Sequence, residues 1–493
     1  VGASREEGKV GHDLLKNLVA YGYGGKVYPV NPRADNILGI KTYASLREIE
    51  DAIDLAVIVV PAPHVLAVVD ECHYKGIDSI IVISAGFKES GIDGASRERD
   101  LLRKIKQYSI RMIGPNCLGL IDTKSALNAS FAADMPAQGG IAFISQSGAL
   151  CTSVLDWAVD ECVGFSKFIS MGNKTDIDEV DLIQVIDSDD QTKVILGYLE
   201  GVNNGMAFMH AAQKITKKTP MIIVKSGGTM AGARAASSHT GTLAGAENAF
   251  DTAFKQSGVL RAKTVEELFD YARIFGQQPL PKGPRIALVT NAGGPGIIAA
   301  DAIERSKLEM ATLSKNTIDL LRSSLPPMAN VYNPVDVLGD AKADRYKFVV
   351  ETVVADPNVD IVLVILTPQT MTEIEKTAEV IGEISNYAGK TVATSFMGGK
   401  RIKNSLKIMC QRKVPNYPFP ERAVSAIEAM YKYTLWQKKP IPEMKEMNMQ
   451  KELVVSAFEK VRQTGRQDLG EDEAKQVISV YGFKIPRSIL ATS

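Results

Sequence analysis

The chain has 493 residues, which is enough for about three domains. With 45% hydrophobic and 23% charged residues, it has the composition of a soluble globular protein. Its 57 basic residues balance 57 acidic ones, which excludes a broad positive surface for nucleic acid or for an anionic membrane.

The five cysteines are scattered and contain no Cys-x-x-Cys pair, which argues against a disulfide framework and against a zinc site. No apolar run approaches the ~20 residues of a membrane span, and the beginning of the sequence lacks the pattern of a signal peptide. We therefore expect a protein of the reducing cytoplasm with no metal site of its own.

Up to about residue 127, short β-branched runs alternate with helical stretches, which predicts a parallel sheet covered by helices on both faces. In such a doubly wound domain, ligands bind at the carboxyl ends of the strands. The first residues, Val1-Gly2-Ala3-Ser4, have the pattern of a strand end and its turn, so we expect a few residues to precede them. The expected strands are residues 25–30, 55–60, 79–83 and 111–113.

A dinucleotide is the obvious ligand to consider, but its sequence requirements are missing. It needs G-x-G-x-x-G after the first strand and an acidic residue at the end of the second. Here the glycines after Gly2 are Gly8 and Gly11, and the second strand ends in Asn31-Pro32-Arg33. This counts against a nicotinamide-dependent oxidoreductase, and a purely structural turn remains an alternative to a ligand site.

The alternation of strands and helices restarts after residue 140 and again after the linker 279–284. Strands of the second unit are expected at 141–145, 165–171, 194–199 and 221–225. Strands of the third unit are expected at 285–291, 361–366 and 391–395, before a closing helix around 423–436.

Both later units open with a strand, a turn of small residues and an apolar helix. The turns are Ser145-Gln146-Ser147-Gly148 and Asn291-Ala292-Gly293-Gly294-Pro295-Gly296. Because the N-terminus of a helix binds anions, two such turns that face each other would hold a phosphoryl group. Ordinary helix-start chemistry is the alternative for each turn alone.

Among the five histidines, His239 stands out because it lies in a run of small residues, Ala235-Ala236-Ser237-Ser238-His239-Thr240-Gly241-Thr242. Small neighbours leave the imidazole room to move, and an imidazole can act as base, ligand or nucleophile near neutral pH. A structural, hydrogen-bonding histidine is the alternative.

At the other end of the sequence, residues 438–449 have the composition of a linker, and Leu469-Gly470-Glu471-Asp472 opens a predicted helix. We expect too few residues after this helix for a fourth unit with its own core.

Several motifs resemble those of the NDP-forming acyl-CoA synthetases, in particular the ADP-forming acetate–CoA ligases, and more distantly succinyl-CoA ligase. The most specific is Gly232-Ala233-Arg234-Ala235-Ala236-Ser237-Ser238-His239-Thr240-Gly241. The others are Gly114-Pro115-Asn116-Cys117-Leu118-Gly119, Ser145-Gln146-Ser147-Gly148, Gly172-Asn173-Lys174 with Asp176 and Asp181, Tyr198-Leu199-Glu200-Gly201, and Asn333-Pro334-Val335-Asp336. Members often carry Arg-Ser where this chain has Gly228-Thr229, so we place no catalytic role on that turn.

The resemblance covers nearly the whole chain and implies an α/β architecture of several domains. It implies a CoA-binding Rossmann-like domain at 1–130, flavodoxin-like CoA-ligase domains at 138–277 and 283–437, a linker at 438–460, and the beginning of an ATP-grasp domain at 461–493.

The resemblance also implies catalytic roles. His239 would be the nucleophile that is phosphorylated during turnover, and Glu200 would hold the other ring nitrogen, with a solvated glutamate at a strand end as the alternative. The phosphoryl group would be bound by Gln146, Ser147, Gly148, Gly293, Gly294 and Gly296. Asn116 would orient the acyl or phosphoryl group, or else only cap its turn, and Asp336 would fix a loop near the site.

CoA is expected along the strand ends of the first domain. Gly2 and Ser4 would meet its diphosphate region, and Lys9 would counter the charge unless it is an ordinary surface lysine. The groove would be shaped by Pro32, Pro61 and Ala62.

The implied reaction couples a short carboxylate, such as acetate or a hydroxybutyrate, with CoA and ATP to give acyl-CoA, ADP and phosphate. It would proceed through an acyl phosphate and a phosphohistidine. ATP would bind with Mg²⁺ in an ATP-grasp domain of the same longer chain or of a partner subunit, and we expect a homo-oligomer. The main rival is a non-catalytic, acyl-CoA-sensing module of the kind fused to protein acetyltransferases.

Overall fold

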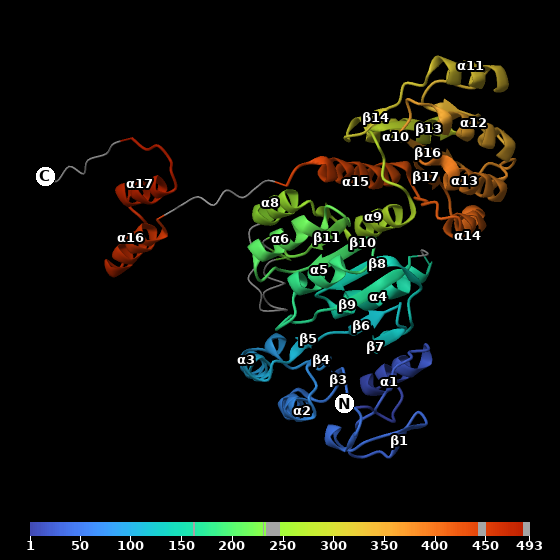
Figure 1. Ribbon diagram of the computed structural model, residues 1–493. Coiled ribbons are helices and arrows are strands. Elements are labelled where there is room, and N and C mark those ends of the chain that lie inside the picture. The colour runs from blue at the N-terminus through green and yellow to red at the C-terminus, as the bar shows by residue number, and fades with distance from the viewer. Residues whose placement is uncertain (161–162, 230, 233–246, 442–449, 487–493) are drawn as a thin grey trace. The chain divides into compact units, whose positions relative to one another are not determined.

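A computed structural model describes residues 1–160, 163–229, 231–232, 247–441 and 450–486. It divides into two compact units, Val1–Lys439 and Pro440–Ser493. The first unit contains three successive α/β domains, each built on a mainly parallel sheet (Figure 1). The α/β class predicted from the sequence is therefore confirmed.

The first domain has a parallel sheet in the order β3-β4-β5, with register pairs such as Ile58 with Val82. These strands span Ala56–Ile58, Ser79–Val82 and Arg111–Ile113. One face packs against α2 (Ala62–Lys75) and α3 (Ile92–Gln107), and the other against α1 (Val10–Ala20). A hairpin of β1 (Asn36–Ile37) and β2 (Ile40–Lys41) and two short 3-10 helices (Leu46–Glu48 and Lys88–Ser90) complete it.

The strand expected at 25–30 is wrong, because only Val30 makes a bridge, with Tyr43. The Pro29 carbonyl accepts the Tyr43 N–H at 3.0 Å, and the Val30 carbonyl accepts the Gly2 N–H at 2.9 Å. The Asn31 N–H also donates to the Tyr43 carbonyl at 2.9 Å. Pro29 itself has no N–H to donate, so these few bonds do not extend into a ladder.

The second domain has a seven-stranded sheet in the order β12-β11-β10-β8-β9-β6-β7, in which β6 and β7 are antiparallel. Residues 119–130, which the sequence pattern groups with the first domain, lie in this sheet. In chain order the strands are Gly119–Asp122, Leu127–Ser130, Gln138–Ser145, Phe165–Ser170, Val194–Leu199, Met221–Lys225 and Leu260–Ala262. One face packs against α4 (Gly148–Asp160) and α9 (Val265–Gln277), and the other against α5 (Glu179–Asp187), α6 (Gly205–Ile215) and α8 (Glu247–Ser257).

The third domain repeats this plan with a fully parallel sheet in the order β14-β13-β16-β17, to which β15 adds beside β13. In chain order the strands are Arg285–Thr290, Glu309–Met310, Val335–Asp336, Ile361–Leu366 and Thr391–Phe396. One face packs against α10 (Gly293–Glu304) and α15 (Pro420–Lys438), and the other against α11 (Lys315–Ser324), α12 (Ala343–Ala355), α13 (Ile374–Ala388) and α14 (Lys403–Gln411), which follows a 3-10 helix at Lys400–Ile402.

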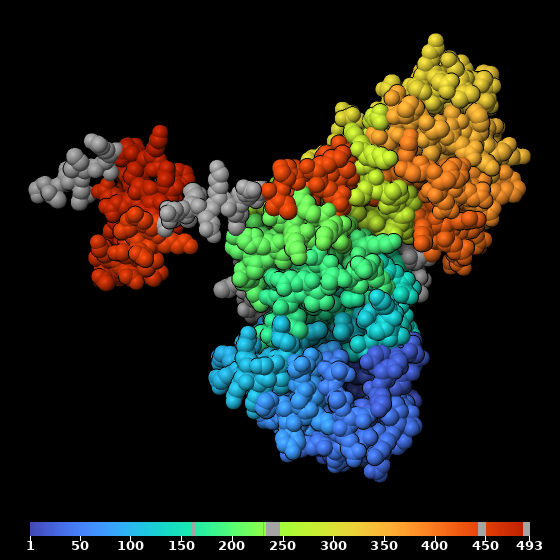
Figure 2. Space-filling model, viewed as in Figure 1, coloured from blue at the N-terminus to red at the C-terminus, as the bar shows by residue number. Residues whose placement is uncertain are grey.

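The second and third domains share one hydrophobic core, because α9 of one packs against α15 of the other. Phe269 and Ile274 of α9 and Met430 of α15 are all buried in it. The side chains of α15 lie directly against the second domain (Figure 2). Arg422 on α15 also binds Asp270 on α9 at 2.7 Å.

The second unit contains α16 (Lys451–Gln463) and α17 (Glu471–Val480). The carboxylate of Glu473 accepts the Gly470 N–H at 2.7 Å, which caps the helix predicted near this point. Part of α16 falls where the sequence predicts a linker. Val454 and Val461 are the buried apolar side chains among the described residues of this unit.

Cys72, Cys117 and Cys151 are buried free thiols, whereas Cys410 is disulfide-bonded. The expectation of reduced cysteines is therefore wrong at Cys410. A single disulfide requires only that two Cβ atoms lie about 4 Å apart in space, and spacing along the sequence does not reveal this.

Across the described ranges of the chain, none of the helices combines the length and apolar character needed to cross a membrane.

Candidate active site

Three neighbouring parallel strands of the second domain end side by side. In the order β11-β10-β8 they end at Lys225, Leu199 and Ser145. The register pairs Leu199 with Lys225, and Tyr198 with Ser145. The residues that follow β10 and β8 therefore leave the sheet next to each other, at the edge where open α/β sheets bind ligands.

The turn after β8 is held by its own hydroxyl groups. Ser145 Oγ accepts the Ser147 N–H at 3.0 Å and donates to the Ser147 carbonyl at 3.0 Å. Ser147 Oγ then accepts the Leu150 N–H at 3.2 Å, and α4 begins at Gly148. The first N–H groups of a helix lack intrahelical acceptors and carry the positive end of its dipole, so this turn is suited to an anion.

Gln146 lies in the same turn, but its side-chain oxygen is engaged by the main chain. Oε1 accepts the N–H groups of Glu200 and Gly201, the latter at 3.1 Å. The Gln146 N–H donates to the Tyr198 carbonyl at 3.1 Å. Gln146 therefore connects the turn after β8 to the loop after β10.

The turn after β13 repeats this geometry in the third domain. Thr290 Oγ1 accepts the Ala292 N–H at 3.1 Å and donates to the Ala292 carbonyl at 2.9 Å, as Ser145 does with Ser147. A Cβ atom on Gly293 or Gly294 would meet no atom within 4 Å, whereas one on Gly296 would lie 3.3 Å from Thr290. The similarity of the two turns expected from the sequence thus extends to their hydrogen bonds. Among the hydrogen bonds of the described residues, none joins one turn to the other.

Asn116 adopts a left-handed backbone with φ of 60°. Its N–H donates to the Ser84 carbonyl at 3.0 Å, and its Nδ2 donates to Asn173 Oδ1 at 3.3 Å. Asn173 in turn donates to Glu89 at 2.7 Å and to Glu98 at 2.8 Å. Asn116 is therefore part of a polar network that connects the first domain to the second.

Glu200 follows β10 and is half-buried. The buried ammonium group of Lys225, on the neighbouring strand, lies 4.6 Å from the ring centre of Phe250. Burial lowers the pKa of Lys225, while the charges of Glu247 and Glu200 act in the opposite direction. The carboxyl ends of β10 and β11 are therefore partly shielded from water, so that charges interact more strongly there than in bulk solvent.

His239 lies outside the described residues, within the segment 233–246. The chain enters this segment from the end of β11 and leaves it at Glu247, where α8 begins.

The strand ends of the first domain bring several of the residues expected to bind CoA to one edge. The Val59 N–H donates to the Val1 carbonyl at 2.9 Å, and a Cβ on Gly2 would lie 2.7 Å from the Val59 carbonyl oxygen. α2 begins at Ala62, directly after Pro61. The segment that leads to Pro32 is held at the same edge by Asn31 Nδ2, which donates to the Ala3 carbonyl at 2.7 Å.

Lys9 and Ser4 lie in the turn that precedes α1. Lys9 forms an exposed ion pair with Glu6 at 3.5 Å, and Ser4 Oγ accepts the Glu6 N–H at 3.1 Å. An exposed ion pair of this kind contributes little to stability, so Lys9 can exchange Glu6 for another anion at low cost.

Two thiols belong to the same region of the chain as the proposed site residues: Cys117 follows Asn116, and Cys151 lies on α4. Burial raises the pKa of each to about 12. Since only a thiolate is strongly nucleophilic, neither cysteine competes with His239 as the candidate nucleophile.

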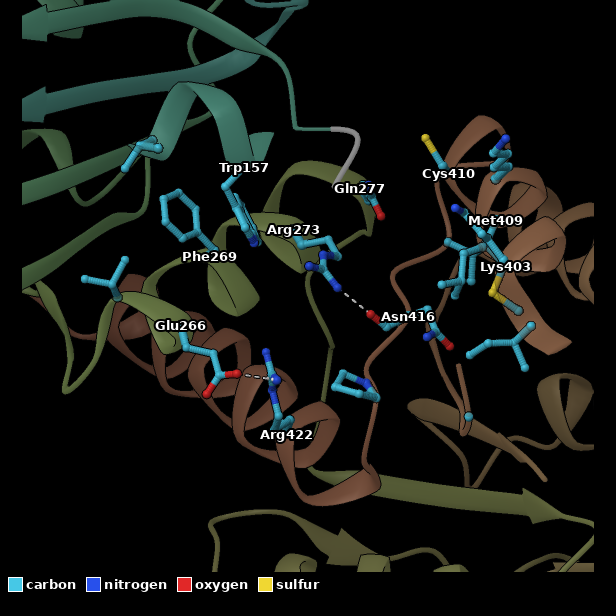
Figure 3. Close-up of a pocket in the computed structure, with 18 of the residues that line it drawn as sticks. Trp157, Glu266, Phe269, Arg273, Gln277, Lys403, Met409, Cys410, Asn416 and Arg422 are labelled. Carbon is cyan, nitrogen blue, oxygen red and sulfur yellow. Dashed lines mark hydrogen bonds and ion pairs between the residues drawn. The ribbon is translucent and has the colours of Figure 1, made fainter. Parts of the chain in front are cut away.

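A cavity of about 810 Å³ lies between α4 and α9 of the second domain and the segment 398–418 of the third (Figure 3). Trp157 and Phe269 line one side, and Arg273 reaches across to the Asn416 carbonyl (Figure 3). None of the described site residues predicted from the sequence lines this cavity.

Sequence reasoning misses a role for Lys174 and Glu179. They form an ion pair of 2.9 Å, with side chains only 4% and 2% exposed, and Lys174 donates to the Gly201 carbonyl in the loop that carries Glu200. Gly172-Asn173-Lys174 stands out in the sequence only as a motif, because residue spacing does not show which loop Lys174 contacts.

Three family models match successive parts of the chain. A CoA binding domain matches residues 1–123, a succinyl-CoA ligase like flavodoxin domain matches 138–275, and a ligase-CoA domain matches 286–439.

Similar proteins cover most of the same span. Acetate–CoA ligase [ADP-forming] I of Archaeoglobus fulgidus is 42% identical over 486 residues, which is 98% of this chain and 69% of that protein. The alpha subunit of acetate–CoA ligase [ADP-forming] II of Pyrococcus furiosus is 42% identical over 87% of this chain and 94% of its own length. The solved structure of a dinucleotide forming acetyl-coenzyme A synthetase 1 of Ca. Korarchaeum cryptofilum, in complex with phosphate and ADP, matches with a TM-score of 0.85 at 37% identity, covering 88% of this chain and 94% of that one.

Proposed function

The chain belongs to the ADP-forming acyl-CoA synthetases and is therefore an acid–thiol ligase, and we propose that it works through a phosphohistidine at His239. The overall reaction converts a short carboxylate, CoA and ATP into acyl-CoA, ADP and phosphate. Acetate or a related acid such as a hydroxybutyrate is the proposed substrate.

In the first step of the proposed reaction, the γ-phosphoryl group of ATP is transferred to His239, and ADP leaves. A carboxylate oxygen of the substrate then attacks phosphorus, so that the P–N bond breaks and an acyl phosphate forms. The thiol of CoA attacks the acyl carbon and releases phosphate. ATP with Mg²⁺ would bind in an ATP-grasp domain, of which residues 461–493 are the proposed beginning, or in a partner subunit, as the existence of a separate alpha subunit in Pyrococcus furiosus suggests.

The observation that carries the proposal is that Glu200 follows β10 next to the turn formed by Gln146, Ser147 and Gly148. The N–H groups of this turn would bind the phosphoryl oxygens. The carboxylate of Glu200 would hold one imidazole nitrogen while the other bears the phosphoryl group and the ring becomes cationic. We assign the same phosphoryl-binding role to Gly293, Gly294 and Gly296, and an orienting role to Asn116.

CoA is proposed to lie at the strand ends of the first domain, with Gly2, Ser4 and Lys9 near its diphosphate and with Pro32, Pro61 and Ala62 along the groove. This would bring its thiol toward Asn116, which hydrogen-bonds across to the second domain.

The proposal is tested by incubating the complete enzyme, including its ATP-grasp domain, with γ-labelled ATP. We expect acid-labile, base-stable label in the parent protein and none in His239→Ala, while His210→Ala, a change on the exposed surface of α6, is labelled normally. Label that persists in His239→Ala would overturn the assignment of the nucleophile. A parent protein that binds acyl-CoA but takes up no label would instead favour a non-catalytic sensing module.

A further inference from the structure

The loop between β10 and α6 carries Glu200, and its main chain is held by side chains from other elements. The Gly201 N–H donates to Gln146 Oε1 at 3.1 Å. The Gly201 carbonyl accepts a hydrogen bond from Lys174 Nζ at 2.6 Å. Both polar groups of the residue after Glu200 are therefore fixed by side chains, and no strand pairing is needed to place them.

Glu179, at the start of α5, completes this support. Its Oε2 pairs with Lys174 Nζ at 2.9 Å, and its Oε1 accepts the Asn203 N–H at 3.3 Å. The two side chains are 4% and 2% exposed. A buried ion pair gains little net stability, because dehydration of the two charges offsets their attraction. The pair does, however, define one position for the loop, since moving the loop would leave buried charges without their hydrogen bonds.

Lys174 is itself held in place by its own turn, which is anchored to the first domain. Its backbone is left-handed, with φ of 45°, which a lysine adopts only where the surroundings impose it. The residues on either side of it are anchored to the first domain: Asn173 donates to Glu98 at 2.8 Å, and Thr175 Oγ1 donates to Glu98 at 2.6 Å. The ammonium group of Lys174 thus extends from a fixed turn to the Glu200 loop.

We propose that Lys174 and Glu179 are positioning residues that hold the Glu200 loop so that the Glu200 carboxylate meets the imidazole of His239. This inference rests on the proposed function, in which Glu200 acts on the phosphohistidine. Neither residue touches the reacting atoms, so both act through Glu200.

His239 can be phosphorylated by two donors, acetyl phosphate and ATP. Comparing the two distinguishes a positioning role from a general loss of structure. Acetyl phosphate transfers its phosphoryl group at the Glu200 site: the bond from phosphorus to the acetyl oxygen breaks, a P–N bond forms, and acetate leaves. In the proposed function ATP is bound by the ATP-grasp domain, so we assign the transfer of its γ-phosphoryl group to that domain and give Glu200 no part in it. In the complete enzyme, labelled acetyl phosphate and labelled ATP therefore report on different sites through the same histidine.

We expect Lys174→Met and Glu179→Gln to slow labelling from acetyl phosphate by about 10- to 100-fold, as for a displaced catalytic group, and to leave the rate from ATP unchanged. Glu179→Gln keeps the shape of the side chain and carries the test if Lys174→Met does not fold. Glu200→Gln is the reference and should show the same selective loss.

Asp189→Asn is the matched control. Asp189 binds Lys167 at 3.0 Å in another partly buried ion pair, beyond the opposite end of α5. We expect Asp189→Asn to label equally well from both donors. The inference is overturned if folded Lys174 and Glu179 variants label normally from acetyl phosphate while Glu200→Gln does not, or if they lose both labelling reactions by the same factor. Normal labelling of Glu200→Gln from acetyl phosphate would overturn the proposed role of Glu200 itself.

Discussion

At the scale of single residues, the candidate site depends on side chains that hold main-chain groups. The sequence predicts Gln146 as a phosphate ligand, yet its Oε1 accepts the N–H groups of Glu200 and Gly201. It predicts that Asn116 orients a substrate group, and Asn116 Nδ2 donates to Asn173. These amides fix the loops that carry the proposed catalytic residues, so we expect part of their contribution to be geometric.

Replacing Gln146 by alanine should therefore affect catalysis as well as stability. The change removes the acceptor of two half-buried N–H groups, which costs about 1 to 3 kcal/mol, and lets the Glu200 loop shift. We expect kcat for acyl-CoA synthesis to fall by about 10- to 100-fold and KM for CoA to stay the same. Steady-state kinetics and urea unfolding would measure the two effects.

Gln191→Ala provides a matched control for this prediction. Gln191 Nε2 donates to the Gly139 carbonyl at 3.1 Å, at the opposite end of β8. It should lower stability by less than Gln146→Ala, because it leaves one carbonyl without its donor, and it should leave kcat unchanged. If Gln146→Ala retains full kcat, the support of the Glu200 loop by this side chain is not needed for turnover.

At this scale the sequence predicts features that local residue patterns determine, and it misses features that depend on contacts between distant segments. The runs of apolar β-branched residues predict β10 at Val194–Leu199 and β16 at Ile361–Leu366 with their observed bounds, because buried parallel strands are continuous hydrophobic segments. The contact of Lys174 with Gly201 joins residues 27 positions apart, and it arises only when β9 and β10 take their places in the sheet. No local pattern encodes such a contact, so the role of Lys174 had to come from the structure.

At the scale of elements, two turns interlock between the first and second domains. The turn at 114–116 accepts hydrogen bonds from the turn at 172–175: the Pro115 carbonyl accepts the Asn173 N–H at 2.9 Å, and the Gly114 carbonyl accepts the Thr175 N–H at 3.2 Å. Gly172 makes this close approach possible, because a Cβ there would lie 2.3 Å from the Pro115 carbonyl oxygen.

Gly172→Ala should therefore lower the free energy of unfolding by more than the cost of placing alanine in a left-handed backbone conformation. Its φ of 57° costs an alanine about 1 to 2 kcal/mol, and the clash with Pro115 adds about 1 to 3 kcal/mol. Gly389, after α13, has a similar φ of 61°, but a Cβ atom added there would meet no atom within 4 Å. Gly389→Ala should thus lose only the conformational part, and equal losses for the two variants in urea unfolding would show that the interlocked turns tolerate a methyl group.

At the scale of the whole molecule, contacts between the domains connect Val1–Lys439 into one unit. Asn17 of α1 donates to the Ser130 carbonyl at 2.9 Å, and Arg111 of β5 binds Asp176 at 3.0 Å, so the first domain is joined to the second by polar contacts. The second and third domains share the core around α9 and α15. A ligand bound in the first domain should therefore stabilise more than that domain alone.

CoA should accordingly raise the temperature of the main unfolding transition, and NAD should not. A ligand present at 100 times its Kd stabilises the folded state by about 2.7 kcal/mol, and the contacts of the first domain with β7 and α5 would transmit this to the second. The loop after Gly2 lacks the glycine spacing that binds a dinucleotide. The segment Asn31-Pro32-Arg33 also lacks the acidic residue that NAD would need to bind its ribose. Differential scanning calorimetry of the chain with CoA, with NAD and with neither measures the shifts. An equal shift with NAD, or none with CoA, would contradict the assignment of Gly2, Pro32 and Pro61 to a CoA groove, whereas a shift confined to a separate first transition would show that the domains unfold independently.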